Sequence, residues 1–416
     1  MRTNKNYEIV DDVEIQNLLE KFNSPLFIVS ERIIKEKYQK LKDTLCVFYP
    51  DSKISYSYKT NYLPAICKIL KDCGAAAEVA SGFEYWLAKK LGYSGGDIIF
   101  NGPYKKDDEL LNAIGDGCIL NIDNYFELLR IEKIAKERSA IAKIGLRVNT
   151  NHSRHGSSPW NRFGFNIENG EAMAMCLKIR KEFKNLEIVG IHSHLGTNIS
   201  DVSIYRLAME KIVDFIVEIK KSIDIKMEYI DIGGGFAVYG NKLKTAAEES
   251  ITSVSDYVNA VVQPILKKLD YKPLLIFEPG RFLVAEAMTL FTKVISKKEI
   301  EGVRTITIDS SISILREAAF IDFHISAVVK ENISLAPTVI FGSSCTQSDV
   351  LGRANLPLLE VGDVLAIYNV GAYSLPRSSQ WIFPRPAIVL IKSSNEAELA
   401  RRAETYEDLI HLDKLL

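Results

Sequence analysis

Reactive residue types recur directly after short apolar runs between residues 50 and 283. Lys59 follows one such run, and His192 closes another. Alone, a lysine in this position is usually a solvated surface residue, and a histidine is usually a satisfied core or loop group. If the runs are neighbouring strands of one barrel, their ends meet and these residues form one site. The residues are Lys59, Glu78, Ser81, Arg147, His192, His194, Gly233, Gly234, Gly235, Glu278, Gly280 and Arg281.

These residue types suit an anionic cofactor that carries a carbonyl group. A lysine in a partly desolvated site loses its proton and can form a Schiff base, as Lys59 could. The triple glycine 233–235 has no Cβ atoms, so backbone N–H groups can approach a phosphate. A glutamate such as Glu278 that faces a pyridine nitrogen would keep it protonated, and a histidine ring could stack on the cofactor.

His192 and His194 also permit a metal interpretation. Two residues that are two positions apart in a strand share one face, so both rings could bind one ion. The sequence offers no third and fourth ligand at a clear spacing. We therefore expect no metal site.

The elements that must position these residues follow a repeated pattern. Stretches with helical periodicity, such as Leu207, Ile212, Phe215 and Ile219, lie between strand-like runs. Strands that alternate with helices predict a parallel sheet, and eight units predict a closed (β/α)₈ barrel. An open doubly wound sheet is the alternative. The eight runs are 54–58, 76–80, 97–100, 118–122, 144–148, 188–192, 229–232 and 274–277.

The pattern changes after about residue 283. The runs 303–308, 338–341 and 364–368 follow one another with few helical intervals, which predicts a mostly antiparallel β domain. We therefore expect an α/β protein with a barrel over residues 30–282 and a second domain over 283–416. The segment 1–29 is expected to contribute to the second domain through the run 26–29, and the tail 396–416 reads as a polar helix.

Length and composition exclude several classes of protein. The 416 residues exceed one ordinary compact core, which suggests two domains. A net charge of -1 argues against nucleic-acid and polybasic membrane partners, and the chain shows neither a signal peptide nor a membrane-spanning run. The 6 cysteines are scattered without a CxxC pair, which fits reduced thiols. We expect a cytoplasmic protein.

An ordered series of motifs resembles one family, the alanine-racemase-fold (fold type III) pyridoxal-phosphate-dependent decarboxylases. Within it the chain is similar to the group of diaminopimelate and ornithine decarboxylases, from about residue 25 to residue 386. The motifs are 58–61, 78–84, 192–197, 231–236, 278–281 and 371–373, together with Cys345 and Asp349. The resemblance implies a carboxy-lyase that uses pyridoxal 5'-phosphate.

The resemblance also implies residue roles. Lys59 would bind the cofactor covalently, His194 would stack on its ring, and Glu278 would pair with the pyridine nitrogen. Cys345 would return a proton to the substrate carbon after carbon dioxide leaves. In this family the cysteine and the segment around Tyr373 belong to sites shared between two subunits, so a homodimer is implied. The implied cofactor-binding residues are Lys59, Glu78, Arg147, His194, Thr197, Gly234, Gly235, Glu278, Gly280, Arg281 and Tyr373.

The substrate-binding residues implied by the resemblance are Arg281, Arg316, Phe320, Thr346 and Tyr373. Ornithine and diaminopimelate enzymes carry an acid after the cysteine, where this chain has Thr346, and ornithine enzymes carry Asp where it has Ile321. Burying an unpaired ammonium costs several kcal/mol, which disfavours a free diamine end. Arg316 still offers a bidentate partner for a carboxylate.

We therefore expect an N-acylated diamino acid with a distal carboxylate, such as citryl-ornithine or citryl-diaminopropionate, in siderophore biosynthesis. Decarboxylases of siderophore and antibiotic pathways are the subgroup that the chain is expected to resemble most. One alternative is diaminopimelate decarboxylation in lysine biosynthesis, with Glu317 as the replacement acid. Another is a carrier-protein-bound aminoacyl group.

Two further function classes compete with the decarboxylase. A racemase of the same fold would need a tyrosine base from the β domain and no Cys345, and its order of motifs differs. A non-catalytic protein that binds pyridoxal phosphate would be a single barrel. The long β domain with Cys345 and the motif 371–373 argues against it.

Overall fold

The computed structural model describes the chain except residues 1–8, 152–160, 245–251, 329–333 and 415–416. It divides into two compact units. The barrel unit comprises residues 38–237 and 250–282, and the β unit comprises 1–37, 238–249 and 283–416. The predicted barrel domain was continuous over 30–282, whereas residues 30–37 and 238–249 group with the β unit.

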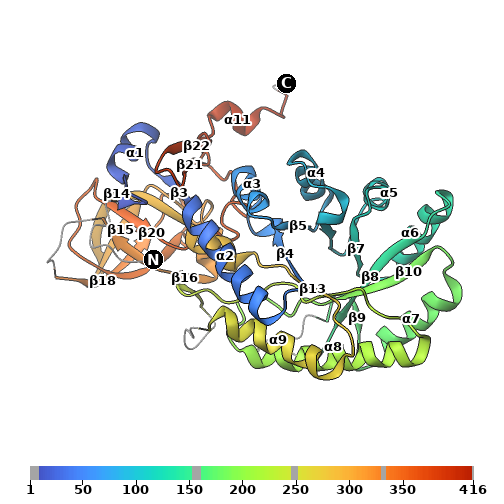
Figure 1. The fold of residues 1–416 in the computed structure, drawn as a ribbon. Coiled ribbons are helices and arrows are strands. Elements are labelled where there is room, and N and C mark those ends of the chain that lie inside the picture. Colours follow the sequence, from blue (N-terminus) through green and yellow to red (C-terminus); the bar gives the residue numbers. More distant parts are fainter. Residues whose placement is uncertain (1–8, 152–160, 245–251, 329–333, 415–416) are drawn as a thin grey trace. The chain divides into compact units, whose positions relative to one another are not determined.

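The barrel unit is built on parallel strands that close into a ring (Figure 1). β8 pairs with β10, and β13 pairs with β4, so the path of neighbouring strands returns to its start. This closure confirms the predicted barrel and excludes the open doubly wound sheet. In the described part of the chain, the eight ring strands are β4 (Ser52–Ser57), β5 (Ala76–Val79), β6 (Ile98–Phe100), β7 (Ile119–Ile122), β8 (Ala142–Asn149), β10 (Leu186–His192), β11 (Tyr229–Asp231) and β13 (Leu274–Phe277).

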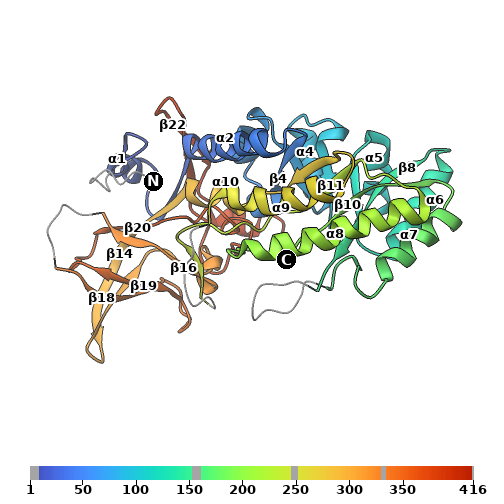
Figure 2. The same ribbon diagram turned by 60° about the horizontal axis from the view of Figure 1, so that its bottom comes forward.

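Helices connect the strands of the barrel unit (Figure 2). Several begin at polar caps just past a strand end: Ser81 Oγ accepts a hydrogen bond from Glu84 N, and Asn124 caps the helix after β7. In α8, Ile212, Phe215 and Ile219 are buried, whereas Leu207 is exposed. The helices are α3 (Pro64–Asp72), α4 (Gly82–Lys90), α5 (Asp107–Asp116), α6 (Tyr125–Glu137), α7 (Glu171–Glu182), α8 (Val202–Ile223) and α9 (Val254–Lys268).

The β unit is mostly antiparallel, as predicted. Its long strand β14 pairs with β3, β15 and β20, and the N-terminal strand β3 also pairs in parallel with β21. The principal strands are β3 (Leu26–Ser30), β14 (Met288–Ile300), β15 (Val303–Ile308), β17 (Ile325–Ala327), β18 (Ala336–Phe341), β19 (Val350–Leu356), β20 (Val364–Ile367), β21 (Ala387–Ile391) and β22 (Ala397–Arg401).

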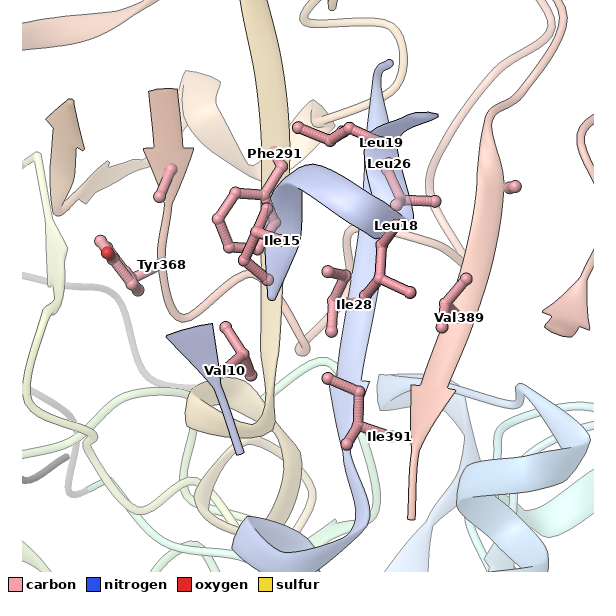
Figure 3. Close-up of a cluster of buried hydrophobic side chains, with 12 residues drawn as sticks. Val10, Ile15, Leu18, Leu19, Leu26, Ile28, Phe291, Tyr368, Val389 and Ile391 are labelled. Carbon is pink, nitrogen blue, oxygen red and sulfur yellow. The ribbon is translucent and has the colours of Figure 1, made fainter. Parts of the chain in front are cut away.

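Apolar side chains from four parts of the sequence form the core of the β unit (Figure 3). Ile15 and Leu18 come from α1 (Ile15–Phe22), and Ile28, Phe291 and Val389 come from β3, β14 and β21. Each of them is at most 5% exposed. Burial of apolar surface therefore holds the N-terminal segment against the C-terminal strands.

The prediction of a polar helix over 396–416 was wrong for most of the described tail. Residues 397–401 form β22, which pairs with β21, and only the short α11 (Tyr406–Ile410) is helical. Backbone pairing to an edge strand outweighs the helix propensity of an Ala-, Glu- and Leu-rich segment, because propensity is a weak term. None of the described helices combines the length and apolar character that crossing a bilayer requires.

Candidate active site

The carboxyl ends of β4 and β5 bring a lysine against a buried acid. Lys59 lies in the single turn η1 (Tyr58–Thr60) directly after β4, and its Nζ forms an ion pair with Oε2 of Glu78. Ser57 Oγ donates a second hydrogen bond to the same oxygen, at 2.5 Å. Glu78 is fully buried, whereas the Lys59 side chain is 38% exposed. The pair therefore fixes the amine at the rim of the barrel with a proton acceptor beside it.

Asn101, which follows β6, joins this pair to a second acid. Its Nδ2 donates to Glu78 Oε1 at 3.2 Å and to Glu278 Oε1 at 2.5 Å. Glu278 follows β13 and is buried, so two carboxylates share one amide donor inside the barrel. Buried carboxylates need such donors because they have lost hydration.

Glu278 also lies near two other buried groups. His192 Nε2 is 3.7 Å from Glu278 Oε2, and one atom each of His192, Asp231 and Glu278 lie within 4.8 Å of one another. Burial and the neighbouring Glu278 raise the pKa of Asp231 well above its usual range. Burial also raises the pKa of Glu278, but the contacts with His192 and Lys59 outweigh it and lower that pKa. The pKa values of the two acids therefore shift in opposite directions, and Glu278 is the stronger acid of the pair.

His192, Asp231 and Glu278 also have ligand atoms for a metal. Carboxylate oxygens of Asp231 and Glu278 accept hydrogen bonds from neighbouring N–H groups. Gly233 N donates to Asp231 Oδ1 at 3.0 Å, and Asn121 Nδ2 donates to Asp231 Oδ2 at 3.2 Å. Asn101 occupies an oxygen of Glu278. These donors join the carboxylates of Asp231 and Glu278 into a hydrogen-bonded network.

The triple glycine after β11 packs directly on other site residues. A Cβ at Gly234 would lie 2.2 Å from the carbonyl oxygen of Glu278, and one at Gly233 would lie 2.6 Å from His194 Nδ1. Gly233 and Gly235 have φ values of +67° and +96°. Only glycine combines this backbone with such close approach, and the turn can therefore bring N–H groups to an anion.

His194 accepts a hydrogen bond from Gly234 N at Nδ1, at 3.3 Å. Desolvation and the charges of Lys59 and Arg147 lower its pKa to about 3. The ring is therefore neutral near pH 7, and its proton is on Nε2 because Nδ1 is the acceptor. A neutral imidazole can stack flat on an aromatic cofactor without an added charge.

The remaining barrel residues of the predicted site lie near the same strand ends. Arg147, in β8, has Nη1 3.6 Å from Asp123 Oδ1, and its guanidinium lies over the Phe163 ring. Thr197 follows β10 and is half-buried. Gly280, where a Cβ would lie 1.9 Å from Thr60 Oγ1, leads into the buried Arg281 at the start of α10 (Arg281–Val284).

The other predicted site residues lie on the β unit. Cys345 is exposed and Thr346 half-buried in the segment between β18 and β19. Asp349 orders this segment, because its carboxylate accepts hydrogen bonds from Ser344 N at 2.9 Å and Ile312 N at 2.7 Å. Arg316 begins the turn η4 (Arg316–Ala319), Phe320 follows it, and Tyr373 is half-buried with a φ of +64°.

Sequence reasoning missed four polar residues of the barrel network. Ser57, Asn101, Asn121 and Asp231 were not expected as site residues, yet each donates to or accepts from a charged or polar neighbour there. All four lie in or directly after predicted strand runs. The rule that reactive groups gather at strand ends could have found them if it had been applied to amides and hydroxyls.

Comparison with known proteins adds three findings. The family described as "Pyridoxal-dependent decarboxylase, pyridoxal binding domain" matches residues 31–285. The diaminopimelate decarboxylase of Methanocaldococcus jannaschii is 33% identical over 97% of this chain and 94% of its own length. That of Aquifex aeolicus is 29% identical over 96% of this chain and 94% of its own length.

Solved structures agree with these sequences. Diaminopimelate decarboxylase from M. jannaschii in complex with L-lysine superposes with a TM-score of 0.91, at 32% identity, over 98% of this chain and 96% of that one. The Helicobacter pylori enzyme with L-lysine has a TM-score of 0.85 at 27% identity, over 96% and 98% of the two chains. The expectation that siderophore- and antibiotic-pathway enzymes would be the nearest group receives no support from these relatives, which are diaminopimelate decarboxylases.

Proposed function

Because this chain belongs to the pyridoxal-dependent decarboxylase family, we propose that it removes carbon dioxide from diaminopimelate and forms lysine. The observation that carries the proposal is the chain of contacts from Lys59 through Glu78 and Asn101 to Glu278. This series of contacts places the amine of Lys59 beside the buried carboxylate of Glu78 at one end, and the acid Glu278 at the other. The relatives named above are diaminopimelate decarboxylases, and this supports diaminopimelate as the substrate.

The residues at the barrel edge fit pyridoxal 5'-phosphate, the cofactor of the family. Lys59 offers the amine that holds it, the glycine turn 233–235 offers backbone N–H groups for its phosphate, and Glu278 offers a carboxylate for its pyridine nitrogen. His194 would lie against its ring. When bound, the cofactor supplies an electron sink for the electron pair that departing carbon dioxide leaves behind.

The residues of this chain control charge and protons around that chemistry. Glu78 Oε2 takes or holds the proton that Lys59 Nζ must lose before it can react. Contacts with His192 and Lys59 lower the pKa of Glu278 despite its burial, and an ionised carboxylate is what holds a pyridine nitrogen protonated. We assign Cys345 Sγ the return of a proton to the substrate carbon.

The distal end of the substrate also needs residues that bind it. Glu317, the expected replacement acid, is buried and accepts a hydrogen bond from Arg377 Nη1 at 2.5 Å. Its charge is therefore already matched by a guanidinium. Together with the neutral Thr346, this observation favours a second candidate, an N-acylated diamino acid with a distal carboxylate. Both candidates place a carboxylate at the distal end, where Arg316 can bind it.

The test is release of carbon dioxide by the holoenzyme from meso-diaminopimelate, lysine, ornithine and citryl-ornithine at equal concentrations, with products identified by chromatography. We expect lysine from diaminopimelate at the highest kcat/KM. A higher kcat/KM for citryl-ornithine would establish the second candidate instead. Activity that requires an added acyl-carrier protein would point to a carrier-bound aminoacyl substrate and overturn both.

We further propose that the enzyme is a cytoplasmic homodimer. The cysteines at 46, 67, 73, 118, 176 and 345 are all free thiols, which suits a reducing compartment. Mixed dimers of inactive Lys59→Ala and Cys345→Ala chains should recover part of the activity if each site takes residues from both subunits. A monomer in sedimentation at assay concentration would refute the dimer.

A further inference from the structure

A row of residues that are paired in register crosses four neighbouring strands of the barrel. Tyr229 of β11 is the partner of Gly190 in β10, which in turn pairs with Gly145 in β8. Gly145 pairs with Asn121 in β7. The Tyr229 hydroxyl donates to Asn121 Oδ1 at 2.7 Å. The tyrosine side chain therefore passes over β10 and β8 to reach a residue of β7.

The two glycines leave the space that this side chain occupies. A Cβ at Gly190 would lie 2.2 Å from Cζ of Tyr229, and one at Gly145 would lie 2.1 Å from its hydroxyl oxygen. Neither glycine has a positive φ, so the backbone alone does not require glycine at these positions. The ring belongs to a buried apolar cluster with Ile99 and Ile276. Glycine inside a strand commonly marks such a close approach, and here it admits the tyrosine.

The hydroxyl of Tyr229 is the donor in its contact with Asn121. Burial raises the pKa of Tyr229 well above its usual range, so the hydroxyl keeps its proton, and an amide oxygen can only accept. The Asn121 amide is thereby oriented with Nδ2 on its other side. There Nδ2 donates to Asn101 Oδ1 at 2.9 Å and to Asp231 Oδ2 at 3.2 Å. Both N–H groups of the Asn121 amide are engaged in this orientation.

Asn101 transmits this orientation to the two acids of the site. Because its Oδ1 accepts from Asn121, its Nδ2 faces the acids and donates to Glu78 Oε1 at 3.2 Å and to Glu278 Oε1 at 2.5 Å. The reversed amide would set an acceptor oxygen against two buried carboxylates, which is costly away from water. Asn101, Asn121 and Tyr229 are each at most 5% exposed.

We propose that Tyr229 is a positioning residue of the active site, which acts through the amides of Asn121 and Asn101. Its hydroxyl keeps the N–H groups of Asn101 directed at Glu78 and Glu278. This inference rests on the proposed function, because that function assigns these acids to the lysine and to the pyridine nitrogen of the cofactor. It does not depend on which amino acid is decarboxylated.

The decisive variant is Tyr229→Phe, which removes the hydroxyl and keeps the ring between the glycines. We expect kcat of the holoenzyme with meso-diaminopimelate to fall about 10-fold, with KM within about twofold, because the amides contact the acids and not the substrate. The matched control is Tyr49→Phe. Tyr49 is 1% exposed, and its hydroxyl donates to the carbonyl oxygen of Pro273 at 2.8 Å. Both variants should lose a similar free energy of unfolding, but Tyr49→Phe should keep its kcat.

A second readout is independent of turnover. The affinity of the full chain for pyridoxal 5'-phosphate, measured by fluorescence titration, should fall about 10-fold in Tyr229→Phe and be unchanged in Tyr49→Phe. A double-mutant cycle then tests the route. In an Asn101→Ala background, adding Tyr229→Phe should change affinity and kcat by less than about twofold, since the amide that it orients is already gone. If Tyr229→Phe does not fold, Asn121→Leu interrupts the row at its last residue and should give the same changes.

The outcomes separate the role of Tyr229 from the proposed function. If the wild type forms lysine but Tyr229→Phe matches Tyr49→Phe in kcat and in cofactor affinity, the positioning role is wrong and the function stands. Additive effects of Tyr229→Phe and Asn101→Ala also overturn the role, because the hydroxyl would then act by another route. If the wild type leaves diaminopimelate untouched, but its cofactor affinity depends on Tyr229 and Asn101 without additivity, the positioning role stands and the proposed substrate falls.

Discussion

The carboxyl edge of the barrel and the core of the β unit are both buried, but they are built on opposite principles. At the barrel edge, Glu78, Asn101 and Glu278 are polar groups whose contacts are specific to single atoms. In the β unit, Ile28 and Phe291 belong to a cluster of packed apolar side chains (Figure 3). Apolar burial depends on volume and area, whereas buried charge depends on which atom carries the proton. Changing one atom should therefore alter function in the first region, and changing volume should alter stability in the second.

The largest expected effect is at Lys59. Lys59→Ala should lower turnover about 10⁴-fold or more, since the covalent anchor of the cofactor is lost. Borohydride reduction of the wild type loaded with pyridoxal phosphate, followed by peptide mass spectrometry, should find the label on Lys59. Lys68→Ala, which removes an exposed lysine paired with Asp72 in α3, is the control and should remain active. A reducible adduct in Lys59→Ala would contradict the assignment.

The second largest effect is expected in the apolar core of the β unit. Phe291→Ala should destabilise the β unit by about 3–5 kcal/mol, because a fully buried ring is lost and a cavity remains. Urea denaturation measures it, and Leu358→Ala, at a site 65% exposed in the same unit, should change stability by less than about 0.5 kcal/mol. Equal effects from the two variants would show that Phe291 is not packed as the structure has it.

The buried carboxylate of Glu84, in α4, tests the barrel edge through the pH dependence of the free energy of unfolding. Burial raises its pKa from 4.5 to about 7. Between these values the folded state holds a proton that the unfolded state has released, so the free energy of unfolding falls as pH rises. The loss should total about 3 kcal/mol and be complete above pH 7. The free energy of unfolding is measured against pH for the wild type and for Glu84→Gln, and the difference between the two curves isolates the contribution of Glu84. A difference that does not change with pH would contradict the raised pKa.

Glu278→Gln sharpens the comparison most directly, since it exchanges one oxygen for a nitrogen. We expect kcat to fall about 100-fold, near 2.7 kcal/mol, because the pyridine nitrogen loses its ionised partner. The melting temperature should move little, as an amide oxygen can still accept from Asn101. Glu228→Gln, at an exposed ion pair with Lys143, should leave kcat unchanged. Full turnover in Glu278→Gln would mean that this acid does not face the ring.

Much of the fold could be predicted because it depends on local patterns. Each of the eight predicted strand runs overlaps a strand of the ring, since buried parallel strands are short apolar runs between helices. The tail shows where this reasoning fails. Residues 397–401 have a composition that suits a helix, but they pair with β21, and no local pattern encodes a partner strand.

The sequence by itself determined which chemistry this protein can carry. Lys59, Glu78, His194, the glycines 233–235 and Glu278 lie in or after strand runs, and their ends meet if these runs close into a barrel. Only the tertiary structure decided which acid is charged and which group is already paired. Asn101 bridges two acids far apart in the chain, burial beside Glu278 raises the pKa of Asp231, and Arg377 binds Glu317 from 60 residues away. Protonation and pairing depend on burial and on distances of a few ångströms between segments remote in sequence, so they exist only once the chain has folded.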